Sequence, residues 1–158
     1  MDILPSTVVI RYLNGYAAAP TGNGAQVAIY DSTGRYQRTA GRQGAGPGEF
    51  SNIRSLAVRP DGGLAVLDMR LTLLPPAALA ATAPVLSRPL PAGIAAARLV
   101  SLADGRVIVN NHLAGQPALC LFDTNLELVR CFGPTASSAR SSELERMIAP
   151  GPKGTVWS

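Results

Sequence analysis

Apolar and polar positions alternate along the chain in short runs, which are separated by clusters of Gly, Pro, Asn and Asp. Short runs rich in Val, Ile, Leu, Tyr and Thr between such clusters are typical of β-strands. The pattern therefore predicts an all-β protein. The expected strands are residues 7–13, 26–30, 35–40, 53–58, 64–68, 71–74, 85–90, 98–102, 107–110, 118–122 and 127–132.

The segments between these runs carry the residues that favour turns and loops. Asn14-Gly15 is a predicted turn, and Asp31–Gly34 is a predicted type I turn with glycine placed for a bulge. Glu143–Ile148 fits either a short helical turn or a strand. Three segments are predicted loops: Ala17–Gly24, which is rich in small residues, Pro75–Ala83, which could also form one helical turn, and the polar segment Gly133–Ser142.

An internal repeat is the strongest signal in the sequence. Residues 26–41 align with residues 118–133, each as strand, aspartate, turn, strand and glycine, at an offset of 92, or two units of 46. Turn glycines at Gly62, Gly105 and Gly154 give spacings of 43 and 49. A repeat of about 40–50 residues that holds four short strands is typical of a β-propeller blade. A β-sandwich would not require this period.

The predicted fold is thus a partial β-propeller of about three four-stranded antiparallel blades within one domain, residues 1–158. A closed ring of six such blades needs roughly 280 residues, whereas the chain has 158. We expect either a fragment or a half-propeller whose apolar end faces need a partner. The expected units are part of a blade at 7–41, blades at 52–90 and 97–133, and the start of a blade at 143–158.

The segment Gly41–Phe50, GRQGAGPGEF, links two of these units. Its glycines and proline exclude a regular strand or helix. A phosphate-binding loop would continue with Gly-Lys-Ser/Thr into a helix, but here a strand follows. We therefore interpret it as a blade-to-blade connector in which Glu49 and Phe50 anchor the loop against a blade.

This segment, followed by IRSLAVRPDGGLAVLD, resembles the NHL-type repeat, and more closely the bacterial six-bladed propellers whose blades are joined by a G-x-G-P-G-E-F loop. The second copy, GPTASSARSSELE, lacks the Gly-Pro-Gly-Glu-Phe core. The resemblance implies a six-bladed relative and an exported, periplasmic or envelope-facing setting, with a cytoplasmic location as the alternative. The matching residues are Gly44, Gly46, Pro47, Gly48, Glu49, Phe50, Pro60, Asp61, Gly62 and Asp68.

Composition and charge narrow the function classes. Hydrophobic residues make up 47% and charged residues 15%, which excludes a disordered polyelectrolyte. The net charge is +4, from thirteen arginines and one lysine against ten acidic residues, but the arginines are scattered, so no nucleic-acid partner is expected. No apolar stretch is long enough to span a membrane, and the start of the chain does not resemble a signal peptide.

Few residues are candidates for catalysis or metal binding. His112 is the single histidine, and no nucleophile motif lies near it, so it is interpreted as a loop residue at a strand end. The resemblance to propellers brings in lyases and lactonases, which bind metal in the central channel through His, Asp, Asn or Glu from several blades. The candidates here are the residues just after the second strand of their blades, Asp68, Asn110, Asn111 and His112. One histidine argues against zinc, while a calcium site with oxygen ligands stays open. We predict no catalytic, cofactor or metal residue.

Cys120 and Cys131 lie on the two arms of one predicted hairpin. If Asp123 pairs with Glu127 around a three-residue loop, the two thiols point to opposite sides of the sheet. A two-residue loop at Asn125-Leu126 would instead place them opposite each other. The first register is preferred by analogy with the Asp31–Gly34 hairpin, so two buried thiols are expected rather than a disulfide.

We expect a non-catalytic interaction or structural module without a cofactor. Its partners would be proteins, either a host complex or a second half-propeller, and a respiratory or photosynthetic membrane complex would fit a truncated ring. One alternative is an enzyme or ligand binder of the lyase or lactonase type that uses the channel of a completed ring. Another is an RNA-binding NHL-like domain using Arg35, Arg38, Arg42 and Arg54.

Overall fold

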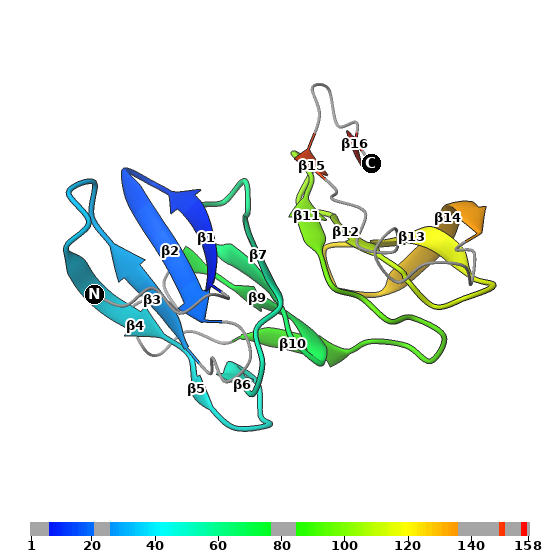
Figure 1. The fold of residues 1–158 in the computed structure, drawn as a ribbon, viewed down its shortest axis with the longest axis horizontal. Helices are drawn as coiled ribbons and strands as arrows, with labels where there is room; N and C mark the ends of the chain where they lie inside the picture. The colour runs from blue at the N-terminus through cyan, green and yellow to red at the C-terminus, as the bar shows by residue number, and fades with distance from the viewer. Residues whose placement is uncertain (1–6, 21–25, 77–84, 136–148, 151–155, 158) are drawn as a thin grey trace.

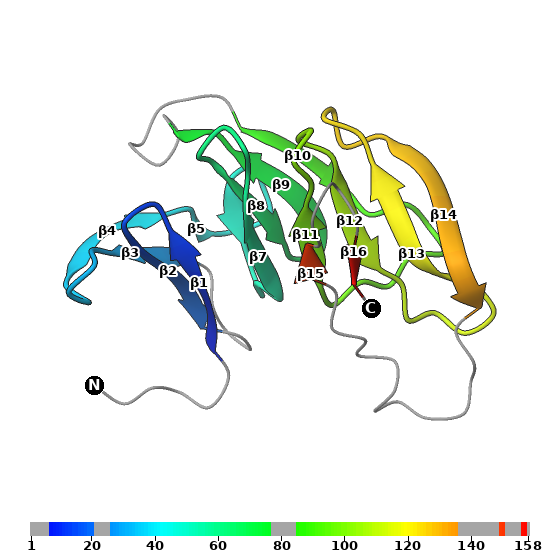
Figure 2. The same cartoon turned by 90° about the horizontal axis from the view of Figure 1, so that it is seen from above.

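Three four-stranded antiparallel sheets form the body of the protein, in a computed structural model that describes residues 7–20, 26–76, 85–135, 149–150 and 156–157. Their strand orders are β1-β2-β3-β4, β10-β9-β8-β7 and β11-β12-β13-β14, so each sheet is a simple meander. We call them the first, second and third blades. Figure 2 shows them following one another across the molecule, with β1, β7 and β11 as the adjacent strands. The fold is a partial β-propeller, as the repeat predicted.

The strands are short, as the spacing of the turn residues requires. In the first blade they are β1 (Thr7–Tyr12), β2 (Gly15–Pro20), β3 (Val27–Tyr30) and β4 (Tyr36–Ala40). In the second they are β7 (Ser55–Val58), β8 (Leu64–Leu67), β9 (Arg70–Leu74) and β10 (Leu86–Pro89). In the third they are β11 (Leu99–Ser101), β12 (Val107–Asn110), β13 (Pro117–Phe122) and β14 (Leu128–Thr135).

Two small sheets complete the described structure. β5 (Arg42–Gln43) and β6 (Glu49–Phe50) pair in parallel within the linker after the first blade. β15 (Ala149–Pro150) and β16 (Val156–Trp157) pair antiparallel, and β15 contacts β11 (Figure 1). The predicted loop at 77–83 and the element at 143–148 lie outside the described residues.

Apolar side chains that alternate along the strands meet between neighbouring blades, which is where the cores lie. One core joins the first and second blades, with Val27, Phe50 and Leu64 at its centre, each at most 1% exposed. The other core joins the second and third blades and includes Leu67, and Phe122 at 1% exposure. Burial between successive blades is therefore what holds the arc together.

The first blade contains one strand more than the sequence indicated. The segment from Ala17, predicted to be a loop, forms β2, and the preceding turn is Leu13-Asn14 rather than Asn14-Gly15. A Cβ on Gly15 would collide with the carbonyl oxygen of Tyr30, so the small residue lets β2 approach β3. Hydrogen bonding to strands on both sides overrides the weak β-propensity of Ala, Gly and Pro.

The third blade also ends later than expected. The polar loop was predicted to begin at Gly133, but β14 continues to Thr135 because Pro117 still pairs with Thr135. The rest of that predicted loop, residues 136–142, lies outside the described part of the chain.

The two repeat hairpins have one irregularity in common. Each carries a register shift, between Ile29 and Tyr30 in the first blade and between Leu121 and Phe122 in the third.

Candidate functional site

The linker Gly41–Phe50 closes on its own residues. The Glu49 carboxylate accepts a hydrogen bond from the Gly46 N–H at 2.9 Å and pairs with Arg42 at 2.6 Å. The Gly46 hydrogen bond, with the Arg42 hydrogen bond second, lowers the pKa of Glu49 below its ordinary 4.5. Glu49 is thus already satisfied inside the loop and does not point to a bound anion or cation.

The glycines of this linker make room for its two anchoring side chains. A Cβ on Gly41 would collide with the Phe50 ring, and a Cβ on Gly44 would collide with the Glu49 carboxylate. Phe50 is 1% exposed and belongs to the core between the first two blades. Each of these motif residues serves the connection between blades. Phe50 therefore anchors the loop against a blade as predicted, whereas Glu49 holds the loop to its own residues Arg42 and Gly46 rather than to a blade.

Asp68 and Asn111, two of the channel candidates, perform the same structural task in successive blades. Asp68 accepts hydrogen bonds from the N–H groups of Ser51 at 2.7 Å and Asn52 at 3.3 Å. Asn111, 43 residues later, accepts one from the N–H of Ala95 at 3.0 Å. Because Ala95 also follows Asn52 by 43 residues, the two contacts are repeat equivalents.

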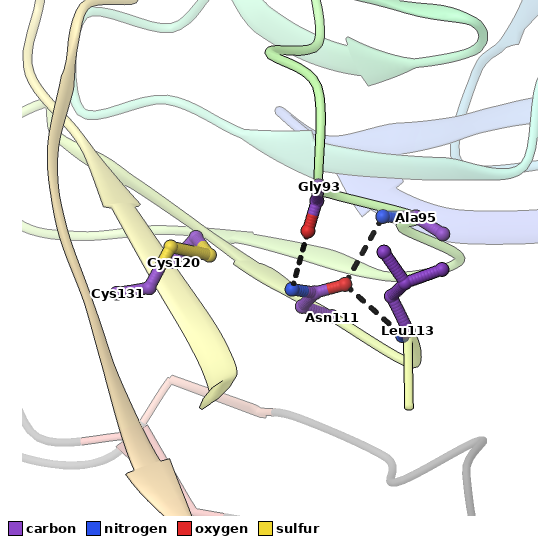
Figure 3. The surroundings of a disulfide bond; sticks show 6 residues. All are labelled: Gly93, Ala95, Asn111, Leu113, Cys120 and Cys131. Atoms are coloured by element: carbon purple, nitrogen blue, oxygen red, sulfur yellow. Dashed lines mark hydrogen bonds between the residues drawn. A yellow bond between two sulfur atoms is a disulfide. The ribbon is translucent and has the colours of Figure 1, made fainter. Parts of the chain in front are cut away.

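Asn111 is further fixed by two more hydrogen bonds (Figure 3). Its Oδ1 accepts from the Leu113 N–H at 3.1 Å, and its Nδ2 donates to the Gly93 carbonyl at 3.1 Å. The side chain thus holds the segment before β11 to the end of β12. A fully hydrogen-bonded amide of this kind supports a loop rather than a ligand.

Asn110 and His112 flank Asn111 and differ from it. The Oδ1 of Asn110 accepts from the N–H groups of Ala97 and Arg98 at 2.9 and 2.8 Å, and the residue is 2% exposed. The backbone N–H of His112 donates to the Ala95 carbonyl at 3.0 Å, and the residue is half-buried. Within the described chain, no group of three or more His, Cys, Asp or Glu side chains could hold a metal ion.

The arginines that could contact RNA do not form one surface. Arg42 pairs with Glu49 on the linker, and Arg54 donates to the Ala96 carbonyl at 3.1 Å between the second and third blades. Arg35 and Arg38 lie exposed at the tip of the first blade. That tip also holds a shallow depression of about 340 Å³ between the β1–β2 and β3–β4 turns.

Cys120 and Cys131 form a disulfide, contrary to the expectation of two buried thiols (Figure 3). The loop itself is as predicted, because the Asp123 N–H donates to the Glu127 carbonyl. A bulge then shifts the register by one residue, so that Cys120 pairs directly with Cys131. The predicted register had the correct turn but lacked the bulge, although the analogous Asp31–Gly34 hairpin was expected to carry one.

The face of the first blade that points away from the second blade leaves apolar side chains uncovered. Val8, Ile10 and Tyr12 pack towards the second blade, so Val9 lies on the opposite face. Val9 is 57% and Tyr36 58% exposed. We call this surface the open face. Its described members are Val9, Arg11, Ala28, Tyr30, Tyr36 and Thr39, identified from strand register and alternation.

The open face is ordered within itself. The rings of Tyr30 and Tyr36 meet edge to face with centroids 6.1 Å apart. The Tyr36 hydroxyl forms a 2.6 Å hydrogen bond with the Thr39 hydroxyl. An open apolar face at each end of the arc was expected from the sequence, but these residues were not predicted. Strand alternation around the repeat could have identified them.

The repeat shows what covers this face in a complete neighbour. At the offset of 92, Ala28 and Tyr30 correspond to Cys120 and Phe122. Those two residues are 0% and 1% exposed in the core between the second and third blades. Positions that are buried by a preceding blade in the third blade are therefore partly exposed in the first.

Solved structures similar to this chain are β-propellers. A candidate exported protein of Bacteroides fragilis superposes with a TM-score of 0.65 at 15% identity, over 81% of this chain and 37% of its own. Virginiamycin B lyase of Staphylococcus aureus gives 0.59 at 11% identity, over 80% and 41%. Regucalcin, a calcium-binding protein of Agrobacterium tumefaciens, gives 0.52 at 15% identity, over 82% and 46%.

These likenesses show the fold alone, because all three identities are 15% or lower. The chain spans less than half the length of each of these three propellers. No protein-family model and no curated protein matches the sequence. None of the described residues forms a helix long and apolar enough to cross a membrane.

Proposed function

We propose that the protein is a non-catalytic interaction module, a propeller arc that functions as part of a larger assembly by docking through its open face. The observation that carries this proposal is the partial exposure of Ala28 and Tyr30 on a blade face whose repeat equivalents, Cys120 and Phe122, are 0% and 1% exposed. Burial of apolar side chains is the main favourable term in protein association, so such a face favours a protein partner.

The arrangement of the channel candidates also supports this proposal. Asp68, Asn110 and Asn111 are 5%, 2% and 4% exposed and direct their oxygens at backbone N–H groups. An oxygen used in this way is not free to bind a cation or to accept a substrate proton. The alternative, a channel enzyme or ligand binder, would have to recruit other groups from a completed ring. A stoichiometric metal ion in the purified protein would favour that alternative.

A setting in the cell envelope forms part of the proposal. The Cys120–Cys131 disulfide fits an oxidising compartment, where such bonds persist. One similar structure is a candidate exported protein. Residence on a respiratory or photosynthetic membrane complex remains one form of the proposal. It predicts that the protein is recovered in the envelope fraction of the cell with its disulfide formed.

The proposal is tested by photo-crosslinking in the cell that makes the protein. A benzoylphenylalanine replaces Tyr36 on the open face, and a control replaces Val129 on β14, which is similarly exposed at 54%. We expect a protein adduct from position 36 and none from position 129. Failure to form an adduct at position 36, or equal adducts at both positions, would overturn the interaction module.

A further inference from the structure

We propose that Arg54 and Arg98 form a binding site for the carboxylate of a small organic acid, with Met69 receiving the apolar part of the ligand. We call these three residues the seam site, because they lie where the second blade meets the third. The second blade separates the seam site from the open face, so this inference does not depend on docking there.

The two arginines are placed side by side by the strands that follow them. Arg54 directly precedes β7 and Arg98 directly precedes β11, and these two strands are adjacent. The first residues of the strands are joined directly, because the Leu99 N–H donates to the Ser55 hydroxyl at 3.1 Å. The backbones of the two arginines are therefore neighbours, although they lie 44 residues apart in the sequence.

Both guanidinium groups are held by neutral backbone carbonyls. Arg54 reaches across the seam and donates through Nη1 to the Ala96 carbonyl at 3.1 Å. Arg98 donates through its own Nη1 to the next carbonyl, that of Ala97, at 3.1 Å, and to the Arg54 carbonyl at 3.4 Å. The two positive charges are thus fixed at the carbonyls of consecutive residues.

No carboxylate compensates this pair of charges within the described part of the chain. Four other arginines form ion pairs with Asp or Glu, but Arg54 and Arg98 form none. Both residues are half-buried, so water and salt screen the repulsion between them less well than on an open surface. An anion bound between them would supply the missing charge.

The hydrogen-bond donors that remain suit a carboxylate. A guanidinium carries five N–H donors, and the Nε and Nη2 groups of Arg98 have no partner among the described residues. These two groups form the planar fork that binds a carboxylate through two parallel hydrogen bonds. A carboxylate on the Arg98 fork would face Arg54 as the second positive charge.

An apolar side chain borders the two charges. The Met69 sulfur lies 3.9 Å from Nη2 of Arg54, and Met69 is 64% exposed in the turn between β8 and β9. A ligand that covers this flexible side chain would remove apolar area from water. An organic acid with a short aliphatic chain therefore matches the seam site better than inorganic phosphate does, because phosphate has no apolar part.

The test follows the arginine Nε–H signals by NMR in the purified, oxidised, isotope-labelled chain. Hexanoate, acetate, phosphate and chloride are added in turn at constant ionic strength. We expect saturable shifts of the Arg54 and Arg98 signals with hexanoate and roughly tenfold weaker binding of acetate, which lacks the longer aliphatic chain. Equal shifts with chloride, or no shift with hexanoate, would overturn the site. Phosphate binding as tight as that of hexanoate would overturn its assignment to an organic acid.

Variants separate the two parts of the site. Arg98→Gln and Arg54→Gln should each weaken hexanoate binding roughly tenfold or more, because each removes a charge-assisted partner. Arg35→Gln, which removes an equal charge at the exposed tip of the first blade, should bind as the wild type does. Met69→Ser should leave acetate binding unchanged and remove the preference for hexanoate. Undiminished hexanoate binding in both Arg54→Gln and Arg98→Gln would overturn the inference, and the wild-type titration locates the site without relying on a variant that must fold.

Discussion

The first and third blades are two copies of one pattern in different surroundings. Both have four meandering strands and a bulged outer hairpin at an offset of 92 residues. In the third blade, Cys120 pairs with Cys131 and Phe122 is buried against the second blade. In the first, Ala28 pairs with Thr39 and Tyr30 lies on the open face. The backbone pattern makes a blade, and the neighbouring blade decides whether a face is core or surface.

Under the proposed docking function, the same strand position serves packing in the third blade and partner recognition in the first. Phe122 has no polar atom on its ring and is enclosed. Tyr30 and Tyr36 keep hydroxyl groups on a face that is partly wet. Aromatic rings with a polar tip suit surfaces that alternate between water and a partner.

The first and third blades should differ most in stability when the aromatic side chain at the equivalent position is removed. Phe122→Ala should lower the free energy of unfolding by about 3–5 kcal/mol, because a buried ring leaves a cavity between two blades. Tyr30→Ala should cost much less in the isolated chain, because its face is open. Urea unfolding of both variants measures the difference. Equal losses would mean that the open face is covered in solution.

Removing the disulfide should have the next largest effect. Cys120→Ala/Cys131→Ala deletes a crosslink across 11 residues, and the expected loss is about 2–4 kcal/mol in the free energy of unfolding. The matched control is Ala28→Ser/Thr39→Ser at the equivalent pair of the first blade. Thermal unfolding with and without reductant gives the measurement. If reductant leaves the melting temperature of the wild type unchanged, the bridge makes no contribution to stability.

A disulfide introduced into the first blade would test whether the two hairpins are structurally equivalent. Ala28→Cys/Thr39→Cys should form a second bridge, because these residues face each other in the register that joins Cys120 to Cys131. The expected gain is about 1–2 kcal/mol, less than the native bridge contributes, since introduced disulfides often distort their site. Mass spectrometry of the blocked and unblocked protein counts the thiols. Two additional free thiols under oxidising conditions would show that the hairpins differ in register.

The smallest effect should come from the linker that leaves the first blade. The folded-state pKa of Glu49 is lowered by the Gly46 N–H and by Arg42, so its contribution to stability is present above the ordinary pKa of 4.5. That contribution is lost as the pH falls through the lower folded-state value. Glu49→Gln should therefore be less stable than wild type at pH 7, with the gap closing as the pH falls below 4.5 and through the lowered folded-state pKa. A gap that stayed constant with pH would argue against an ionised Glu49.

Much of the fold could be predicted from the sequence because the relevant signals are local. The 46-residue unit, the turn aspartates and glycines and the Gly41–Phe50 linker are read from neighbouring residues. They were sufficient for the second and third blades, for the turn at Asp123–Leu126 and for the anchoring role of Phe50, but not for β2 of the first blade. The candidate site was harder to predict from the sequence. The side-chain oxygens of Asp68 and Asn111 accept hydrogen bonds from backbone N–H groups 16 or 17 residues away, and such pairings are not visible in the local sequence.

The sequence by itself thus determined a propeller arc, its repeat length and its connector, because turn chemistry and strand alternation act within a few residues. The tertiary structure alone decided three further features. β2 formed from small residues because two strands flank it. The cysteines met because a bulge moved one strand by one residue. The open face became a candidate site because the burial of a strand face depends on the blade packed against it, and the sequence of the strand does not show whether that blade is present.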